Sequence, residues 1–164
     1  AFMHHLVAKK CIDLRKPMLT ASYVTEEIKA YDEMAKEAGV PILMELGVDP
    51  GIDHMSAMRV IDRVKEKGGT LNSFYSFTGG LIAPEYDNNP WNYKLTWNPR
   101  NVVLAGNGVS QYIQQGRYKY IPYFRLFDRI LKRKILQYGD FEAYANRDSL
   151  SYREIYGLKD IPSM

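Results

Sequence analysis

Cysteine and histidine are scarce in this chain of 164 residues, and their scarcity excludes several kinds of site. Cys11 is the only cysteine, so no internal disulfide can form and a reducing, cytoplasmic location is expected. Cys11 also falls in a helical pattern, where a small buried residue is expected rather than a nucleophile. The three histidines, His4, His5 and His54, do not have the spacing of zinc ligands. We therefore expect no metal site.

Long apolar runs are also missing, although 46% of the residues are hydrophobic. No stretch approaches the roughly 18 residues that a membrane helix needs, so no membrane partner is expected. The opening AFMHHLVAKKC lacks the basic segment and the apolar core of a signal peptide. Because the chain starts on Ala1, already in amphipathic sequence, we expect it to have been cut from a longer protein.

The glycine-rich phosphate loop of dinucleotide-binding domains is absent as well. The pair Gly106 and Gly108 begins like the pattern G-x-G-x-x-G, but Gln111 stands where the third glycine belongs. The residues in hand are therefore not expected to hold a pyrophosphate in the usual way.

Charge is distributed unevenly along the chain. Residues 1–90 hold 10 Lys and Arg against 13 Asp and Glu, a net −3, whereas residues 91–164 hold 12 against 6, a net +6. Such an asymmetry indicates two structural units. The basic half suits nucleic acid or a small polyanion, such as a substrate with several carboxylates. No nucleic-acid motif is present and the basic residues are scattered, so nucleic acid is not an expected partner.

The first third of the chain has the pattern of a strand–helix–strand unit. Residues 2–15 form an amphipathic helix pattern, and residues 18–22 and 41–46 are short apolar runs typical of buried strands. Between the two runs, Thr25 is expected to cap a helix that Gly39 ends. Two strands joined by a helix within about 30 residues predict a parallel sheet.

The rest of the chain changes in character. Residues 52–67 predict one more helix, residues 98–100 the start of a short helix, and Asp148 or Ser149 the cap of a last one. Aromatic, alternating runs predict strands over residues 70–77, 116–123 and 134–146. The expected fold class is α/β plus α+β. The pattern indicates the end of a doubly wound parallel-sheet domain over residues 1–50, followed by an α+β domain over residues 51–164.

The most informative segment is residues 47–54, GVDPGIDH, at the carboxyl end of the second predicted strand. Ligands of open parallel sheets bind at such ends, and the helix that follows favours an anionic ligand. Pro50 and Gly51 suit the centre of a type II turn, in which Asp49 can bond the turn's amides. A purely structural role for Asp49 is equally compatible with this position. Asp53 is placed to cap the helix, and His54 to pack locally.

Seven segments together resemble the saccharopine dehydrogenase family of the glutamate-forming kind. They are residues 21–23 (ASY), 46–54 (LGVDPGIDH), 79–85 (GGLIAPE), 89–90 (NP), 93–94 (YK), 97–100 (WNPR) and 146–149 (NRDS). Their order and spacing match over nearly the whole chain. Carboxynorspermidine synthases share a similar turn at residues 49–51, but the GGLIAPE and NRDS segments favour the saccharopine branch.

The resemblance implies an NAD- or NADP-dependent oxidoreductase of lysine metabolism. It implies that residues 1–50 are the C-terminal part of a Rossmann-type parallel sheet and that residues 51–164 are a mixed-sheet domain for substrate and dimer contacts. The family oxidises saccharopine to glutamate and aminoadipate semialdehyde, or runs the reverse, and it is a homodimer. It further implies that the phosphate loop lies upstream of Ala1 and that more substrate-binding chain lies beyond Met164. The isolated chain is therefore expected to be inactive. Neither NAD nor NADP is favoured by these residues.

The resemblance also assigns roles to individual residues. Asp49 is the catalytic candidate, because a carboxylate favours positive charge on the nitrogen of an imine that accepts hydride. Residues that match substrate-binding positions are Ser22, Tyr23, Asp49 and Arg147. Residues that match positions beside the nicotinamide are Val48, Asp49 and Pro50. Thr78 stands where many fungal relatives have cysteine, so an obligatory thiol is not expected there.

Other interpretations of the same residues stay open. Trp91, Tyr93, Lys94 and Trp97 are weaker site candidates, because aromatic residues at this density more often form a core or a dimer surface. A carboxynorspermidine synthase would carry out a similar imine reduction on a polyamine precursor. A non-catalytic fragment that binds anions, or nucleic acid through its basic half, is the alternative from another class.

Overall fold

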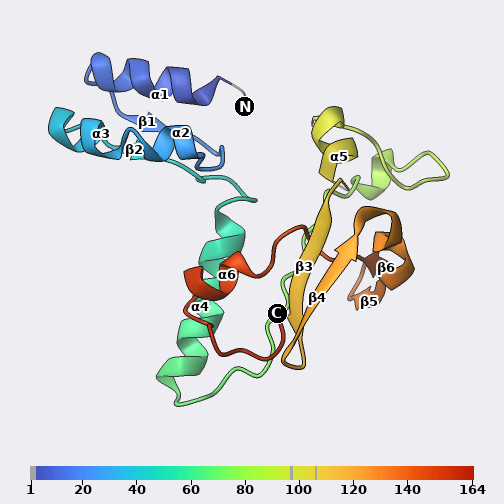
Figure 1. Cartoon of the computed structure of the whole chain (residues 1–164). Coiled ribbons are helices and arrows are strands. Elements are labelled where there is room, and N and C mark those ends of the chain that lie inside the picture. The colour runs from blue at the N-terminus through green and yellow to red at the C-terminus, as the bar shows by residue number, and fades with distance from the viewer. Residues whose placement is uncertain (1–2, 97, 106) are drawn as a thin grey trace. The chain divides into compact units, whose positions relative to one another are not determined.

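A computed structural model describes residues 3–96, 98–105 and 107–164 of the chain (Figure 1). The first residue of the helix predicted over 2–15, Phe2, and the candidates Trp97 and Gly106 lie outside the described residues. The chain divides into two compact units, unit 1 (Ala1–Gly68) and unit 2 (Gly69–Met164), and each is described by itself. The domain boundary expected after residue 50 stays a prediction. No helix among the described residues is long and apolar enough to span a membrane.

Unit 1 combines four helices with a small parallel sheet. Its elements are α1 (His4–Asp13), β1 (Met18–Leu19), α2 (Glu26–Lys29), α3 (Asp32–Ala38), β2 (Ile42–Leu43) and α4 (Ile52–Glu66). The strands pair in parallel, with Met18 beside Ile42 and Leu19 beside Leu43, as the sequence predicts. Both strands are shorter than expected. Helix α1 packs against α2 and α3.

Local signals place the helices of unit 1. The Thr25 hydroxyl accepts the Ile28 amide at 3.4 Å, which caps α2, and Gly39 ends α3 in the left-handed region at φ 64°. The prediction of a single helix between Thr25 and Gly39 is wrong, because the helix is interrupted by a turn at residues 30–31. There the Tyr31 amide bonds the Ile28 carbonyl at 3.0 Å in a tighter turn. Asp32 then starts α3, where an acidic side chain suits a helix N-terminus.

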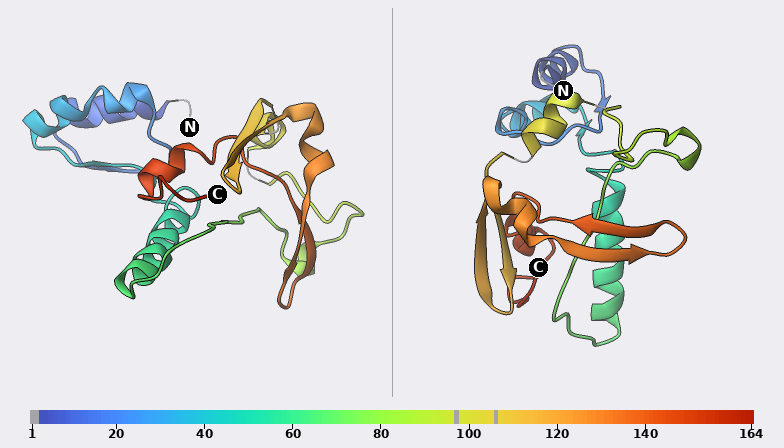
Figure 2. Two further views of the ribbon diagram at one scale, coloured as in Figure 1. Left: turned by 60° about the horizontal axis from the view of Figure 1, so that its bottom comes forward. Right: turned by 90° about the vertical axis from the view of Figure 1, so that its right-hand side faces the viewer.

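Unit 2 consists of two antiparallel hairpins with short helices between and around them. Its elements are η1 (Pro84–Tyr86), α5 (Pro99–Ala105), β3 (Val109–Gln114), β4 (Arg117–Pro122), η2 (Tyr123–Arg129), β5 (Leu131–Ile135), β6 (Gly139–Ala143) and α6 (Ser151–Ile155). Strand β3 pairs with β4, and β5 pairs with β6 (Figure 2). The helix predicted to start near residue 99 is confirmed as α5.

The strands of unit 2 correct three expectations. The strand predicted over 116–123 is present as β4, but its partner β3 was not predicted. The strand predicted over 134–146 is a hairpin instead, turning through residues 136–138 with Gln137 at φ 72°. Residues 70–77 form no strand, so the expectation for this segment is wrong. The Phe74 amide bonds the Ser163 carbonyl at 3.0 Å instead.

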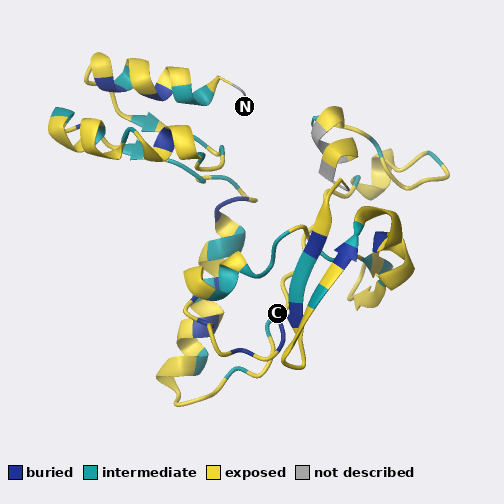
Figure 3. Ribbon diagram, viewed as in Figure 1, coloured by how far each residue is buried: buried dark blue, intermediate teal, exposed yellow. Residues whose placement is uncertain are grey.

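The C-terminal segment completes the core of unit 2. Met164 exchanges two backbone hydrogen bonds with Ile113, at 2.8 and 3.1 Å, so the end of the chain lies along β3. The buried residues of unit 2, dark blue in Figure 3, include Ile113, Ile121, Leu126, Tyr156, Leu158, Ile161 and Met164. Because these residues come from the middle of the unit and from its C-terminal segment, its core depends on contacts far apart in sequence.

Candidate active site

The chain segments that follow β1 and β2 stay side by side beyond the strands. Leu46 donates its amide to the Thr20 carbonyl at 3.0 Å, and Glu45 donates its amide to the Ser22 carbonyl at 3.1 Å. The first segment reaches Tyr23, and the second continues into the turn before α4. Parallel strands end at the same edge of a sheet, which is the edge where such sheets bind ligands. The two segments singled out in the sequence therefore meet.

Tyr23 and Asp49 are joined across this edge. The Tyr23 hydroxyl donates to Oδ1 of Asp49 at 3.0 Å, although 26 residues separate the two. Both residues are exposed, Tyr23 with 54% of its surface accessible. A hydrogen bond to a carboxylate is stronger than one between neutral groups, so the phenol fixes the orientation of Asp49. The sequence placed both residues at the edge but did not predict the bond.

The turn that carries Asp49 differs from the expected type II turn. Gly47 donates its amide to the Pro50 carbonyl at 2.9 Å and accepts the Ile52 amide at 3.0 Å. Gly51 has φ 148° and ψ −89°, far from the type II values, and the Asp49–Pro50 peptide bond is cis. A Cβ atom at Gly51 would lie 2.2 Å from the Gly47 carbonyl oxygen. Only glycine therefore fits at residue 51, for a reason other than the one expected.

Asp53, rather than Asp49, organises the turn itself. Its Oδ1 accepts the Gly51 amide at 2.7 Å, and its Oδ2 lies 3.8 Å from Nε2 of His54. The local roles expected for Asp53 and His54 agree with these contacts. Asp49 is left to bond Tyr23 from the other segment. Because Asp53 bonds the turn and Asp49 bonds Tyr23, a role for Asp49 beyond the turn is favoured.

The remaining candidates of unit 1 frame the Tyr23–Asp49 pair. Val48 has 72% of its surface accessible, and Pro50 is buried under the turn. The Ser22 hydroxyl accepts a hydrogen bond from the Thr20 hydroxyl at 3.3 Å. The structure thus brings together Ser22, Tyr23, Val48, Asp49 and Pro50 in one place.

Arg147 belongs to unit 2, and its backbone is held firmly. Its carbonyl accepts the Gln111 amide at 3.0 Å, and its amide donates to the side chain of Asn146 at 2.8 Å. The Ser149 amide bonds the Gln111 carbonyl at 2.9 Å, so the segment adds to the edge of β3. The Arg147 side chain is exposed. A rigid backbone with an exposed guanidinium suits recognition of a carboxylate.

Asp148 stabilises the same segment from its other side. Its carboxylate accepts the Leu150 amide at 3.0 Å and the Ser151 amide at 3.1 Å, at the start of α6. Partial burial raises the pKa of Asp148. Hydrogen bonds from the backbone and side chain of Ser151, from the Gln111 side chain and from the Leu150 backbone outweigh that effect, so the pKa lies below its ordinary value. This carboxylate is therefore a structural anchor for the turn that presents Arg147.

The weaker candidates of unit 2 lie in its irregular region. Lys94 donates to the Tyr86 carbonyl at 2.7 Å, and the Tyr93 carbonyl accepts the side chain of Asn89 at 3.0 Å. Thr78 is exposed, and Trp91 has 79% of its surface accessible. These contacts organise the loop and assign no chemistry to it.

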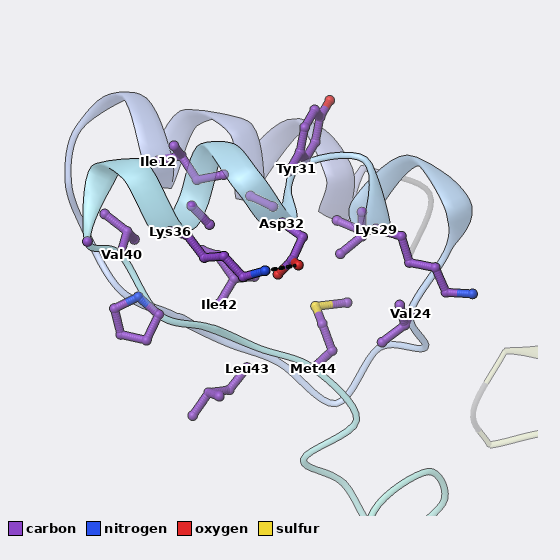
Figure 4. Close-up of a pocket in the computed structure, with 15 residues that line it drawn as sticks. Ile12, Val24, Lys29, Tyr31, Asp32, Lys36, Val40, Ile42, Leu43 and Met44 are labelled. Atoms are coloured by element: carbon purple, nitrogen blue, oxygen red, sulfur yellow. Dashed lines mark ion pairs between the residues drawn. The ribbon is translucent and has the colours of Figure 1, made fainter. Parts of the chain in front are cut away.

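A cavity of about 690 Å³ in unit 1 lies between the helices and the strand segments (Figure 4). Most of its lining is apolar, including Ile12, Ile28, Val40 and Ile42. At its rim Lys36 pairs with Asp32 at 2.7 Å, a bond that raises the pKa of the exposed ammonium group, with a smaller effect from Glu33. None of the site residues lines this cavity, so it is separate from the candidate site.

Two further observations complete the site. Among the described residues, no group of three or more His, Cys, Asp or Glu side chains is placed to hold a metal ion.

Glu45, which sequence patterns assign to the interior of a strand, instead has φ 59° and accepts the Val24 amide on Oε1 at 3.0 Å. No signal in the sequence distinguishes this residue, because its contacts are with a segment 21 residues away.

Comparison with known proteins identifies the family of this chain. Residues 47–164 match the family described as the saccharopine dehydrogenase C-terminal domain. Alpha-aminoadipic semialdehyde synthase of Arabidopsis thaliana is 42% identical over 97% of this chain and 15% of that protein. The NADP(+), L-glutamate-forming saccharopine dehydrogenase of Saccharomyces cerevisiae is 34% identical over 96% of this chain and 35% of that protein.

A solved structure agrees with these sequence relatives. Apo histidine-tagged saccharopine dehydrogenase (L-Glu forming) from Saccharomyces cerevisiae superimposes with a TM-score of 0.90, at 33% identity, over 99% of this chain and 36% of that one. The resemblance seen in the sequence is thereby confirmed, and the carboxynorspermidine synthase alternative is not favoured. The chain spans between 15% and 36% of the length of the relatives named here.

Proposed function

We propose that this chain, which belongs to the saccharopine dehydrogenase C-terminal domain family, is part of an oxidoreductase that interconverts saccharopine with glutamate and aminoadipate semialdehyde. The observation that carries the proposal is the family match over residues 47–164, which includes both Asp49 and Arg147. The reaction belongs to lysine metabolism. We call the protein that joins this chain to a complete cofactor site the whole enzyme.

The proposed chemistry acts on the secondary amine of saccharopine. In the oxidative direction, the protonated secondary amine loses a proton from its nitrogen, and a hydride leaves the ε-carbon of its lysine part, which creates an iminium C=N bond. Water then adds to that carbon, and cleavage of the C–N bond releases glutamate and the semialdehyde. The cofactor, NADP or NAD, takes up the hydride when it is bound.

Asp49 supports this chemistry by its charge and its position. An iminium nitrogen carries positive charge, and a carboxylate fixed beside it lowers the free energy of that state. The hydrogen bond from Tyr23 holds the Asp49 carboxylate in place before substrate arrives. Ser22 and Tyr23, on the neighbouring segment, are proposed to contact the substrate as well.

Arg147 is the proposed ligand for a substrate carboxylate. Saccharopine carries three carboxylates, and a guanidinium binds one of them through two parallel hydrogen bonds. Residues 91–164 carry a net charge of +6, which suits a substrate with this many negative charges.

The nicotinamide end of the cofactor is proposed to lie beside Val48, Asp49 and Pro50. The exposed Val48 side chain next to a carboxylate offers an apolar surface for a flat, positively charged ring. The fungal relatives from Saccharomyces cerevisiae and Pyricularia oryzae are named as NADP(+) enzymes, which favours NADP over NAD for this chain too. The sequence itself holds no G-x-G-x-x-G loop, so these residues are proposed to meet only one end of the cofactor.

The larger assembly follows the same proposal. We infer that β1 and β2 belong to a Rossmann-type sheet and that residues 51–164 form the substrate and dimerisation domain. Every residue of β5 is exposed, as are the apolar side chains of Leu136 and Tyr138 in the adjoining turn. A two-stranded hairpin is marginally stable alone, so a second copy of the protein is the proposed cover.

The location of the enzyme is proposed to be cytoplasmic. The support is the single cysteine, which suits a reducing compartment. The relative from Bos taurus carries the word mitochondrial in its name, and cell fractionation distinguishes the two locations.

The test of this function is the identity of the products. The whole enzyme is incubated with saccharopine and NADP, and the amino acid released is identified by mass spectrometry. We expect glutamate together with one equivalent of NADPH. No NADPH with saccharopine, but turnover with a carboxynorspermidine, would contradict the proposal.

A further inference from the structure

We propose that Glu45 is a positioning residue that fixes Tyr23, and through Tyr23 sets the Asp49 carboxylate for the reaction. The kinetic part of this inference rests on the proposed function. The geometric part rests on contacts within unit 1 alone. Glu45 does not act on the substrate in this proposal, so it is distinguished from the catalytic candidate itself.

Glu45 holds both peptide groups that flank Tyr23. Its amide donates to the Ser22 carbonyl at 3.1 Å, and that carbonyl belongs to the peptide group before Tyr23. Its Oε1 accepts the Val24 amide at 3.0 Å, and that amide belongs to the peptide group after Tyr23. With both neighbouring peptide planes held by one residue, the direction in which the Tyr23 side chain leaves the backbone is fixed.

The backbone of Glu45 is also in contact with the turn that carries Asp49. Its carbonyl oxygen lies 2.7 Å from the position that a Cβ atom would occupy on Gly51. Two residues further on, Gly47 donates its amide to the Pro50 carbonyl. Glu45 therefore sits between the segment that carries Tyr23 and the turn that carries Asp49, and a displacement of Glu45 is transmitted to both.

The conformation of Glu45 is costly for an ordinary residue. Its φ of 59° lies in the left-handed region, where glycine or asparagine is usual and a side chain with a Cβ atom crowds the backbone. A glycine would relieve that crowding but would supply no acceptor for the Val24 amide. The glutamate side chain is therefore the feature that distinguishes this position from a glycine. Residues held in unfavoured conformations often lie at functional sites.

A direct role for Glu45 in binding substrate is not supported by its surroundings. The residue is half-buried, and its carboxylate is bonded to the Val24 amide. A second free carboxylate would also repel a substrate that carries three of them. The positioning role uses the contacts that are present.

The test separates the side chain of Glu45 from its backbone. Glu45→Gly keeps the left-handed backbone without strain and removes the acceptor, whereas Glu45→Gln keeps an acceptor oxygen. Glu37→Gln, an exposed glutamate in α3, is the matched control. In the chain itself we expect Glu45→Gly to keep or raise the Tm and yet to speed hydrogen exchange of the Val24 amide at least tenfold.

In the whole enzyme the kinetic readout is the split between kcat and KM for saccharopine. We expect Glu45→Gly to lower kcat by about tenfold to a hundredfold, since small displacements of a reacting group have effects of this size. Glu45→Gln and the control should stay within about threefold of the parent kcat.

Tyr23→Phe tests whether the effect of Glu45 on kcat passes through Tyr23. If Glu45 acts through Tyr23, combining the two changes costs little more than Tyr23→Phe alone.

The outcomes distinguish this inference from the proposed function. If Glu45→Gly leaves Val24 exchange and kcat unchanged, or if its effect adds in full to that of Tyr23→Phe, the positioning role is wrong. If the parent enzyme does not oxidise saccharopine, the proposed function fails. In that case the exchange rate of Val24 in the chain still decides whether Glu45 holds the Tyr23 segment.

Discussion

The Tyr23 hydroxyl donates a 3.0 Å hydrogen bond to the Asp49 carboxylate, and this bond joins the segments that follow two neighbouring parallel strands. This hydrogen bond gives the exposed Asp49 carboxylate a defined orientation. The turn beneath Asp49 is held by other groups, since Asp53 binds the Gly51 amide and Gly47 binds the Pro50 carbonyl. Asp49 is therefore presented by the fold rather than used to build it.

The tightness of that turn leads to the first prediction, for Gly51→Ala. A Cβ atom there would lie 2.2 Å from the Gly47 carbonyl oxygen, and φ is 148°. We expect the free energy of unfolding to fall by about 3 kcal/mol or more. Gly39→Ala is the control, because its φ is 64° and no atom lies within 4 Å of its Cβ position. That variant should lose only about 1 kcal/mol, and urea denaturation measures both. Equal losses in the two variants would argue against the turn geometry.

The second prediction concerns Asp148 and pH. Its pKa in the folded chain lies below the ordinary 3.8, so the folded state favours the charged carboxylate. The stabilisation is therefore fully present above the unfolded pKa and is lost as pH falls through the lower, folded pKa. We expect Asp148→Asn to be less stable than the parent at pH 7, with a difference that narrows below about pH 4. Denaturant titrations at several pH values measure this difference.

The control for that experiment is Asp140→Asn, since Asp140 is exposed at the start of β6. Its substitution should change the free energy of unfolding little at any pH. A stability difference for Asp148→Asn that persists unchanged at pH 2 would show that the carboxylate charge is not the cause.

The third prediction concerns recognition of the substrate by Arg147. Arg147→Ala should raise KM for saccharopine at least about tenfold, because one bidentate carboxylate contact is lost. Arg147→Lys should restore little of it, since an ammonium group lacks the planar pair of donors. Arg117→Ala, in the exposed β4 terminus, should leave KM near that of the parent. A parent-like KM in Arg147→Ala would remove Arg147 from the site.

The fourth prediction concerns the surface formed by β5 and its turn. Leu131 and Ile135 are exposed on β5, and a charge at either position would have to be desolvated in an apolar dimer interface. We expect Ile135→Asp to convert the whole enzyme from dimer to monomer in sedimentation velocity runs. Val60→Asp, at an exposed apolar residue of α4 in unit 1, is the control. A monomeric parent enzyme, or a dimeric Ile135→Asp variant, would contradict the proposed dimer surface.

Local features of the sequence predicted much of unit 1. Thr25 and Gly39 mark helix ends through their own side-chain and backbone preferences, and the helix expected over residues 52–67 is present as α4. The parallel pairing of β1 and β2 followed from the helices between them. These signals need no knowledge of distant residues.

Unit 2 was harder to predict because its structure depends on distant partners. Strand β3 was missed, since it is bordered by the segment around Arg147 and by Met164 as well as by β4. The aromatic run at residues 70–77 alternates like a strand, yet the Phe74 amide bonds the Ser163 carbonyl of the C-terminal segment and the run is not part of a sheet. Alternation therefore predicts a strand only where a neighbouring strand is available.

The candidate site was predicted in part for the same reasons. Strand order placed Tyr23 and Asp49 at one edge, whereas the exact turn at Gly51 and the left-handed backbone of Glu45 depend on contacts that no local pattern records. The roles of Ser22, Val48, Pro50 and Arg147 stay predictions.

The most direct test of the whole account is the turnover of the Asp49→Asn variant of the whole enzyme. Asparagine keeps the size of the side chain and an oxygen for the Tyr23 hydroxyl, but it removes the negative charge. Asp62→Asn, at an exposed position in α4, serves as the control. With saccharopine and NADP, we predict that kcat falls at least about tenfold in Asp49→Asn and is unchanged in the control, with both variants folded. A parent-like kcat in Asp49→Asn would contradict the central claim that this carboxylate stabilises the reacting nitrogen.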